Sequence, residues 1–310
     1  MSIAVRLAVV AVTVTGLLSA CDAGTAAPSA GPRPAPTTST PRPPSTPATT
    51  TTTTPPLDGF TPIVPGADLT RMVTPLGTIL RIDPKFLSVS VMPGTTEPGG
   101  SFPEGGEVPL AARANLVAAT NAGFKRADAR GGELVDGRSV GTLQPGAASF
   151  VIRADGTFDV GAWQQEVLPE PGDVAVLQNL APLIDHGQPA PALGTNILGR
   201  WGATFRPALP VSVWRSGLGI DALGRLLYAA GPNLVPAQLA QLLLSGGAVR
   251  AMQLDINHLW VFAARFDHPS LTDPEVVVGQ ALLPGMTPTP GHVLVPGTRD
   301  FLAIFQRRTF

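Results

Sequence analysis

The chain is 310 residues long and carries 21 Lys and Arg against 22 Asp and Glu, a formal net charge of −1. A nucleic-acid-binding surface normally shows as clustered Lys and Arg. The sequence contains no basic run, so we expect no nucleic-acid partner. Only one of the 310 residues is a cysteine.

The N-terminus has the pattern of an export signal. Arg6 precedes the apolar run Leu7–Leu18, which is shorter than the ~20 apolar residues that an ordinary membrane-spanning helix needs. The next residues, "LSAC", are similar to the lipobox of bacterial lipoproteins. This resemblance implies a signal peptide over residues 1–20, lipidation (with palmitate or another acyl chain) at Cys21, and a location at the outer face of the bacterial plasma membrane. An ordinary secretory signal cut nearby is the alternative.

Residues 21–56 are predicted to form a disordered tether. They consist mainly of Pro, Thr, Ser and Ala, and such a tract has too little apolar surface to offset its ordering entropy. A glycosylated stalk is the other reading. Because Cys21 is the sole cysteine, the domain predicted over residues 57–310 has no disulfide, no thiolate nucleophile and no Cys-ligated metal.

From Leu57 onward, short apolar runs alternate with Gly and Pro. The alternation in 86–91 predicts a half-buried strand, and 115–120 is a second apolar run that ends at Asn121. Asp155-Gly156, between two β-rich runs, predicts a hairpin with a type I′ turn, which requires positive φ at both central positions. A second hairpin is predicted to turn near Ala222–Gly224.

One helix is predicted in "LVPAQLAQLLLSGGA". Pro236 suits its first turn, the leucines give one apolar face, and Gly246 suits an αL C-cap. A strand follows and delivers Asp255, and 301–307 is predicted to be a closing strand. Together these elements predict an α+β fold, with a mixed, largely antiparallel sheet and a few packed helices in a single domain.

Several chemistries have no support in the sequence. No nucleophile elbow, phosphate-cradling loop or dinucleotide fingerprint is present. No two histidines have helical i, i+4 spacing, so we predict no metal site and no cofactor, although a divalent cation that neutralises a phosphate is left open. The histidines are His186, His258, His268 and His292.

Polar residues occur where predicted strands end. Each alone would be a turn residue or a satisfied core polar group. Together they supply a carboxylate, a guanidinium and several amides, which suits an anionic, hydroxyl-rich ligand. They are Asn121, Asn179, Arg215, Asp255 and Asn257.

The same segments carry a family resemblance. In chain order they include "ATNAGFK", "GGELVDG", "LQNLAPLIDHG", "VWRSGLGIDALGRLLYAAG" and "VRAMQLDIN". This series resembles the phosphodiester glycosidase family over roughly Val108–Phe266. The resemblance implies an enzyme that hydrolyses a sugar-1-phosphodiester, releasing the sugar and leaving a phosphomonoester on the other partner.

The resemblance also implies roles for single residues. Asn121, Gly123 and Phe124 match an Asn-Gly-Gly-Phe-like turn of the family, and Arg215 and Gly219 match its Arg-x-x-x-Gly strand. By this match Arg215 holds the phosphate and Asn121 helps to orient sugar or phosphate oxygens. Further expected substrate-binding residues are Gly123, Asn179, Asn257 and Gly219.

Asp255 matches the Asp of the family's Leu-Asp-Gly-Gly motif and is expected to act at the anomeric carbon, as nucleophile or as base. Two departures stand beside this match: Ala122 replaces the first Gly of the turn, and Ile256-Asn257 replaces Gly-Gly after Asp255. The second departure either retunes the site or silences it. We therefore expect an extracytoplasmic hydrolase of glycosyl phosphates in the cell envelope. A non-catalytic envelope glycan binder and a purely structural lipoprotein are the alternatives.

Overall fold

The computed structural model describes residues 58–64, 67–100, 102, 105–191, 193, 197–202 and 212–307. The predicted signal peptide, Cys21 and the tether lie outside these ranges. The chain divides into two units, Met1–Thr52 and Thr53–Phe310, and all described residues belong to the second. No helix in the described ranges is long and apolar enough to cross a membrane.

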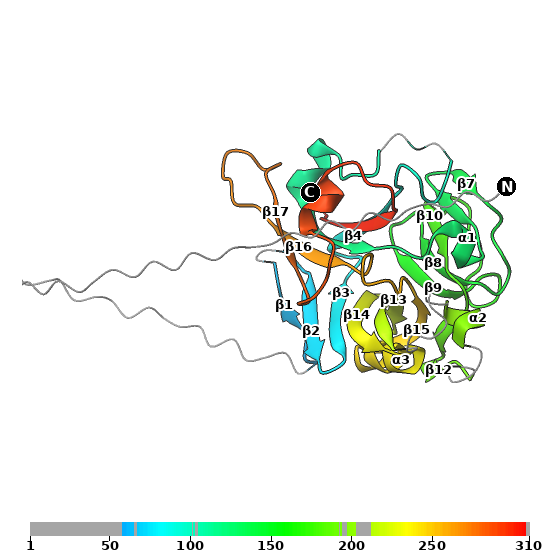
Figure 1. Ribbon diagram of the computed structural model, residues 1–310. Helices are drawn as coiled ribbons and strands as arrows, with labels where there is room; N and C mark the ends of the chain where they lie inside the picture. The colour runs from blue at the N-terminus through cyan, green and yellow to red at the C-terminus, as the bar shows by residue number, and fades with distance from the viewer. Residues whose placement is uncertain are drawn as a thin grey trace, which may run out of the picture. The chain divides into compact units, whose positions relative to one another are not determined.

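The described residues form three β-sheets (Figure 1). The large sheet has eight strands, in the order β1 (Thr61–Pro62), β2 (Thr70–Thr74), β3 (Gly77–Ile82), β14 (Leu226–Leu234), β13 (Val213–Asp221), β15 (Ala248–Gln253), β11 (Pro182–Asp185) and β12 (Gln188–Pro189). The second sheet has five, in the order β17 (Val278–Ala281), β16 (Ala263–Asp267), β5 (Leu116–Asn121), β18 (Phe301–Gln306) and β4 (Leu87–Met92). The third sheet has five, in the order β7 (Arg138–Val140), β6 (Glu133–Val135), β10 (Ala175–Gln178), β8 (Ala148–Ile152) and β9 (Phe158–Ala162).

Helices contribute little to the described fold. They are three α-helices, α1 (Arg126–Ala129), α2 (Ile197–Trp201) and α3 (Pro236–Ser245), and two 3₁₀-helices, η1 (Leu110–Asn115) and η2 (Pro290–Leu294). Every strand ladder in the described ranges is antiparallel. The prediction of a largely antiparallel sheet is confirmed. The mixed sheet and the α+β class were wrong, because several neighbouring strands join through tight turns and parallel strands need longer crossovers.

The hairpin of β8 and β9 is confirmed, but its turn type was wrong. Gly156 N donates to Arg153 O at 2.9 Å, and of the two central residues only Gly156 has a positive φ, +80°. The connection is thus a type I turn closed by a left-handed glycine. Asp155 Oδ1 instead accepts hydrogen bonds from N and Oγ1 of Thr157. The second predicted hairpin is also confirmed, as β13 and β14.

The predicted helix is α3, with Pro236 at its first position. The predicted αL cap is displaced by one residue: Gly246 has φ −83° and Gly247 has φ +92°. The helix keeps one more right-handed residue because Gly246 N still donates to Leu243 O at 3.1 Å. The glycine that takes the left-handed conformation is therefore Gly247.

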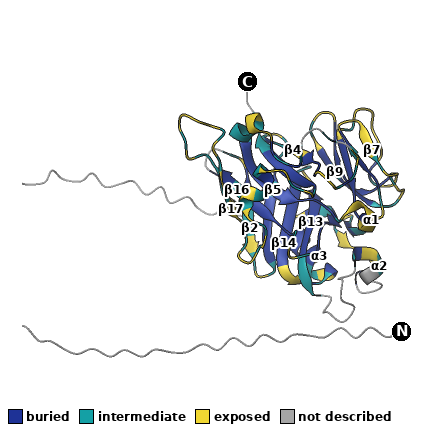
Figure 2. Ribbon diagram, turned by 45° about the horizontal axis from the view of Figure 1, so that its top comes forward, coloured by how far each residue is buried: buried dark blue, intermediate teal, exposed yellow. Residues whose placement is uncertain are grey.

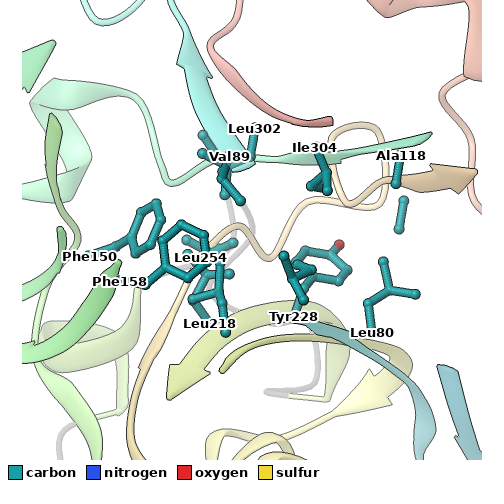
Figure 3. Close-up of a cluster of buried hydrophobic side chains, with 14 of the residues drawn as sticks. Leu80, Val89, Ala118, Phe150, Phe158, Leu218, Tyr228, Leu254, Leu302 and Ile304 are labelled. Atoms are coloured by element: carbon teal, nitrogen blue, oxygen red, sulfur yellow. The ribbon is translucent and has the colours of Figure 1, made fainter. Parts of the chain in front are cut away.

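The main core lies where the three sheets meet. Figure 3 shows Leu80 of β3, Ala118 of β5 and Phe150 of β8, one from each sheet, in the same buried cluster. All six residues of β5 are buried, as Figure 2 shows in dark blue. On its other face, the large sheet packs against α3, whose Leu239 and Leu243 contribute to a second cluster. Side chains at the strand ends are therefore held against rigid neighbours.

Candidate functional site

A small polar cavity lies at this junction of sheets. Asn121 is the last residue of β5, and Asp300 directly precedes β18, the strand paired with β5 through Phe301 and Asn121. Asp255 follows β15 by two residues. The cavity has a volume of about 50 Å³, which is room for a few water molecules or one small group. Its lining includes Asn121, Asp255, Trp260, His292, Arg299 and Asp300.

Asp255 is held by three donors. The backbone N–H groups of Ile256 and Asn257 donate to its Oδ1 at 2.7 and 2.8 Å, and Arg299 Nη2 donates to its Oδ2 at 3.1 Å. The residue is 2% exposed. Burial raises the pKa of the Asp255 carboxyl above its ordinary value, against the opposing effect of Arg299. The cavity therefore contains a fixed carboxylate in a poorly solvated setting.

The Ile256-Asn257 pair fits this backbone without strain. Neither residue has a positive φ, so the conformation does not require glycine. The Ile256 side chain is buried, at 6% exposure, while its N–H points to the carboxylate of Asp255. Asn257 Oδ1 accepts from Leu259 N at 3.0 Å and closes a local turn. Replacing two glycines by this pair thus preserves the hold on Asp255.

Both polar atoms of the Asn121 side chain are hydrogen-bonded within the protein. Its Nδ2 donates to Ala122 O and Ser216 Oγ, at 2.7 and 2.9 Å. Its Oδ1 accepts from Tyr228 Oη and Phe262 N, at 2.8 and 3.0 Å. The amide has no donor left for a ligand. In this geometry Asn121 fixes the cavity wall.

Arg299 is the guanidinium of the cavity. Its Nη2 donates to Gly123 O at 2.8 Å as well as to Asp255, and its Cζ lies 5.0 Å from the ring centroid of Trp260. Its Nε is buried without a hydrogen-bond partner in the described part of the chain. An oxygen of an anionic ligand would fit this donor.

Asp300 is the second carboxyl group of the cavity. It is 4% exposed, and neither of its oxygens has a hydrogen-bond partner among the described residues. Its Oδ1 lies 3.9 Å from Arg299 Nε. Burial, with the charges of Glu97 and Asp255, raises the pKa of Asp300 to about 7. Such a carboxyl can give or take a proton near neutral pH.

Glu133 of β6 is buried beside this group. Burial, and then the charge of Asp300, raises the pKa of the Glu133 carboxyl to about 9. Its Oε2 has no hydrogen-bond partner in the described ranges. Because each carboxyl disfavours the charge of the other, at least one of the two favours its protonated form.

Arg215 does not line the cavity. The side chains of successive β13 residues alternate between the two faces of the large sheet, and Ser216 faces Asn121. Arg215 therefore lies on the α3 face, where its Nε donates to Leu234 O and its Nη1 to Gln253 Oε1, at 2.8 and 2.5 Å. It is 1% exposed, and burial lowers the pKa of its guanidinium to about 10. Arg299 occupies the place at the cavity that the sequence analysis gave to Arg215.

Asn179 ties two sheets together behind the cavity. Its Nδ2 donates to the carbonyl oxygens of Gln253 and Leu254, and its Oδ1 accepts from Phe124 N. A Cβ at Gly123 would lie 3.2 Å from Asn179 Oδ1, so the absence of a side chain allows this close packing. Both residues shape the turn that presents Gly123 O to Arg299.

The remaining predicted residues lie elsewhere. Gly219 is in β13, where an added Cβ would meet Ala248 and the backbone of Arg250, so it serves packing within the large sheet. His258, for which no role was predicted, is exposed and does not line the cavity. Cys21 lies outside the described residues.

His292 lines the cavity, although the sequence analysis gave it no role. Its Nδ1 lies 2.7 Å from Thr289 O. Because a carbonyl oxygen only accepts, Nδ1 carries the hydrogen, and Nε2 is the acceptor in the neutral ring. Burial lowers the pKa of His292, which keeps the ring neutral at neutral pH.

The described residues contain no group of three or more His, Cys, Asp or Glu side chains arranged to hold a metal ion. Arg299 pairs with Asp255 and lies 3.9 Å from Asp300. The residues of the cavity can supply acid–base, nucleophilic and electrostatic chemistry.

Arg299 and Asp300 were missed because they lie beyond the segments that carry the family resemblance. One signal was available: the dipeptide Arg299-Asp300 directly precedes the predicted closing strand. The strand that follows them pairs with the strand that ends at Asn121. Arg299 and Asp300 therefore lie at the same edge of the sheet as Asn121. The sequence alone did not show which strand that partner is.

No protein-family model matches this chain, and no curated protein matches it. Among solved structures, the chain is similar to the catalytic domain of zebrafish N-acetylglucosamine-1-phosphodiester alpha-N-acetylglucosaminidase, auto-inhibited by its pro-peptide. The identity is 18% and the TM-score 0.47, over 77% of this chain and 82% of that one. It is also similar to a hypothetical protein from Synechocystis (15% identity, TM-score 0.38, 80% and 61% coverage). A protein from Burkholderia pseudomallei matches at 14% identity and TM-score 0.39, over 76% and 74%.

With TM-scores this low, the similarities describe a distant likeness of fold. The residues of the cavity provide the basis for a functional assignment.

Proposed function

We propose that the protein is a hydrolase that cleaves a sugar-1-phosphodiester, with Asp255 acting at the anomeric carbon and Arg299 binding the phosphate. The observation that supports this most directly is the ion pair of Arg299 with Asp255 at the wall of a cavity. A guanidinium suits a phosphodiester anion, and a carboxylate suits the positive charge that develops at an anomeric carbon. The motif series around Asn121 and Asp255 adds the substrate class.

The cavity size limits how the substrate binds. Because the cavity is small, about 50 Å³, we place only the phosphoryl group inside it. In the proposed complex the phosphate lies against Arg299 Nε, and the rest of the substrate extends past Trp260. The ring of Trp260, already in contact with Arg299, offers an apolar surface for one face of a sugar.

The test is hydrolysis of a panel of aryl and alkyl phosphodiesters of 1-phospho-sugars by the chain from Leu57 onward. Wild type should release the sugar and a phosphomonoester, and Asp255→Asn should lower kcat/KM by about 10²–10⁴-fold, the usual range for a group that acts in proton transfer. The matched control is Asp221→Asn, which removes a buried carboxylate from the β13–β14 turn. Equal turnover by wild type and Asp255→Asn would refute the role of Asp255.

A second candidate function is glycan binding without turnover. The observation that favours it is that both oxygens of Asp255 already accept hydrogen bonds from the protein. A carboxylate so well satisfied can serve as a fixed part of the wall. Binding of envelope glycans that persists in Asp255→Asn, with no product from any diester, would identify the protein as a binder.

For the location we propose a lipid anchor at Cys21 that holds the hydrolase outside the plasma membrane, where envelope glycolipids and polymers are the substrates. The support is the "LSAC" pattern after an apolar run. In a bacterial host, full-length wild type should incorporate labelled palmitate and sediment with membranes. Cys21→Ser should do neither. Label that persists in Cys21→Ser would refute the anchor.

A further inference from the structure

The proposed roles of Asp255 and Arg299 leave the Asp300 carboxyl unused. This side chain lines the cavity, is 4% exposed, and has two oxygens without a hydrogen-bond partner in the described ranges. A buried carboxylate without partners is costly. The group is therefore either protonated or bonded to a ligand with a donor hydrogen.

Next to Asp300, the cavity has a donor that lacks an acceptor. Arg299 Nε is buried and unpartnered among the described residues, 3.9 Å from Asp300 Oδ1, which is too long for a hydrogen bond. One wall thus presents an unfilled donor next to unfilled acceptors. A phosphate oxygen that carries a proton, or accepts one, satisfies both groups.

Charged neighbours surround Asp300 from three directions. Arg299 and Asp255 face it across the cavity, Glu97 contributes a negative charge, and Glu133 approaches from the third sheet. Arg126 acts on Glu133, and neutral His292 completes the cavity lining. The four carboxyls of Asp255, Asp300, Glu97 and Glu133 cannot all ionise around Arg299 without cost, so at least one proton is retained.

We propose that Asp300 is the proton donor of this site, delivering its proton to the phosphate oxygen of the scissile bond, and that the buried carboxyl of Glu133 is a positioning residue that acts on Asp300 through its charge. The inference rests on the proposed function for its substrate. It assigns separate roles to the acids: Asp255 acts at the sugar carbon, and Asp300 at the phosphate.

The proton balance closes with water alone. As the bond from the anomeric carbon to the phosphate oxygen breaks, its electron pair stays on that oxygen, which takes the proton of Asp300. A water molecule supplies hydroxyl to the anomeric carbon, and its remaining proton returns to the carboxyl pair. One water is consumed, and the products are the free sugar and a phosphomonoester.

The first test reads protonation without activity. In protein with ¹³C-labelled Asp and Glu carboxyls, NMR titration should show two carboxyls that keep a proton above the ordinary acidic range, one changing near pH 7 and one near pH 9. Asp300→Asn should remove one and lower the pKa of the other, because the neighbouring charge is gone. Titration of every carboxyl in the ordinary acidic range would overturn the protonated Asp300 and its coupling to Glu133.

The second test reads catalysis. If Asp300 must be protonated, kcat/KM of wild type for the diester should fall as pH rises past about 7. Asp300→Asn should lower kcat/KM at low pH by about 10²–10⁴-fold and abolish this limb. Glu133→Gln should move the limb to lower pH with a smaller loss of rate. His292→Gln should retain the limb.

The two proposals can fail separately. If wild type is active and Asp300→Asn keeps both its rate and its alkaline limb, proton donation by Asp300 is wrong and the hydrolase stands. If wild type cleaves no diester, the hydrolase and proton donation both fail, while the NMR titration still decides whether Asp300 and Glu133 titrate as a coupled pair. Because the titration of wild type needs no variant, a misfolded Asp300→Asn does not block the test.

Discussion

Arg299 Nη2 donates to Asp255 Oδ2 at 3.1 Å and to Gly123 O at 2.8 Å. Arg299 therefore links the start of β18 to the segments that follow β15 and β5 at the cavity. This contact links the acid expected at the sugar carbon to the cation expected at the phosphate. It also neutralises the charge that burial would otherwise make costly at Asp255. The pair is therefore both a structural tie and the candidate reaction centre.

Arg299→Lys tests the guanidinium geometry. A lysine keeps the charge but cannot bond Gly123 O, Asp255 and a phosphate oxygen through one planar fork. We expect kcat/KM for the diester to fall by about 10²-fold, mainly through KM, and the melting temperature to fall as well, because the tie to Gly123 O is lost. Steady-state kinetics and calorimetry measure both. Arg225→Lys, at the β13–β14 turn, is the matched control, and an equal effect of both changes would contradict a role for Arg299 in binding.

Arg215→Met tests a structural role for the arginine on the α3 face. The change leaves Leu234 O and Gln253 Oε1 without their buried donor, which should cost about 1–3 kcal/mol of unfolding free energy. Urea denaturation measures this loss. Turnover per folded molecule should fall far less than in Arg299→Lys. The opposite order of effects on turnover would return the phosphate to Arg215.

Tyr228→Phe tests whether the Tyr228 hydroxyl holds the Asn121 side chain in place. The Tyr228 hydroxyl has a single hydrogen, which Asn121 Oδ1 and Phe262 O share, each 2.8 Å from Oη, in the main core. Removing it should cost about 1–2 kcal/mol and loosen the cavity wall, so kcat should fall at constant temperature. The matched variant Phe150→Leu also perturbs the core but has no contact with Asn121. A similar loss of kcat there would show that core stability, not Asn121, is responsible.

The pH dependence of stability follows from the two raised carboxyls. Asp300 and Glu133 have folded-state pKa values of about 7 and about 9, above those of the unfolded chain, so the folded state binds protons that the unfolded state has released. Their contribution is fully present in acid and is lost as pH rises through those values. Urea denaturation at several pH values should show stability falling from about pH 5 to about pH 9. Glu133→Gln should make stability fall less steeply in the upper part of this pH range. An unchanged slope would contradict the raised pKa of Glu133.

Gly247→Ala tests the end of α3. Because Gly247 has φ +92°, an alanine there should lower the unfolding free energy by about 1 kcal/mol, although its Cβ would meet open space. Thermal unfolding measures the shift. Gly246→Ala is less informative about φ, since its Cβ would lie 3.1 Å from Ile79. A neutral Gly247→Ala would contradict the left-handed cap.

Much of the local structure could be predicted because it depends on neighbours in sequence. The alternation in β4, the apolar run of β5, the hairpins and α3 all follow from periodicity and turn residues. The errors are also local in origin. The turn at Asp155 and the cap at Gly247 each depended on which of two adjacent residues takes the positive φ, and the sequence offered both.

The site was predicted less completely because it depends on which strands are neighbours. Asp255 and Asn121 were identified by their motifs, and both line the cavity. Arg215 was expected to hold the phosphate, but its side chain lies on the α3 face of the large sheet. Side chains of β13 alternate between the two faces, and the sequence alone does not show which of them face the cavity until the contact of Ser216 with Asn121 is known. Arg299 and Asp300 could not be linked to Asn121 without the pairing of β18 with β5.

The place of β18 has a consequence for when the protein can act. This C-terminal strand lies between β5 and β4 in the second sheet, and it brings Arg299 and Asp300 to the cavity only when it has paired with β5. Until that pairing forms, Asp255 lacks its cation and neither Arg299 nor Asp300 lines the cavity. The complete cavity therefore exists only when the second sheet does, and unpairing of this one strand in the folded protein would dismantle the cavity as a unit.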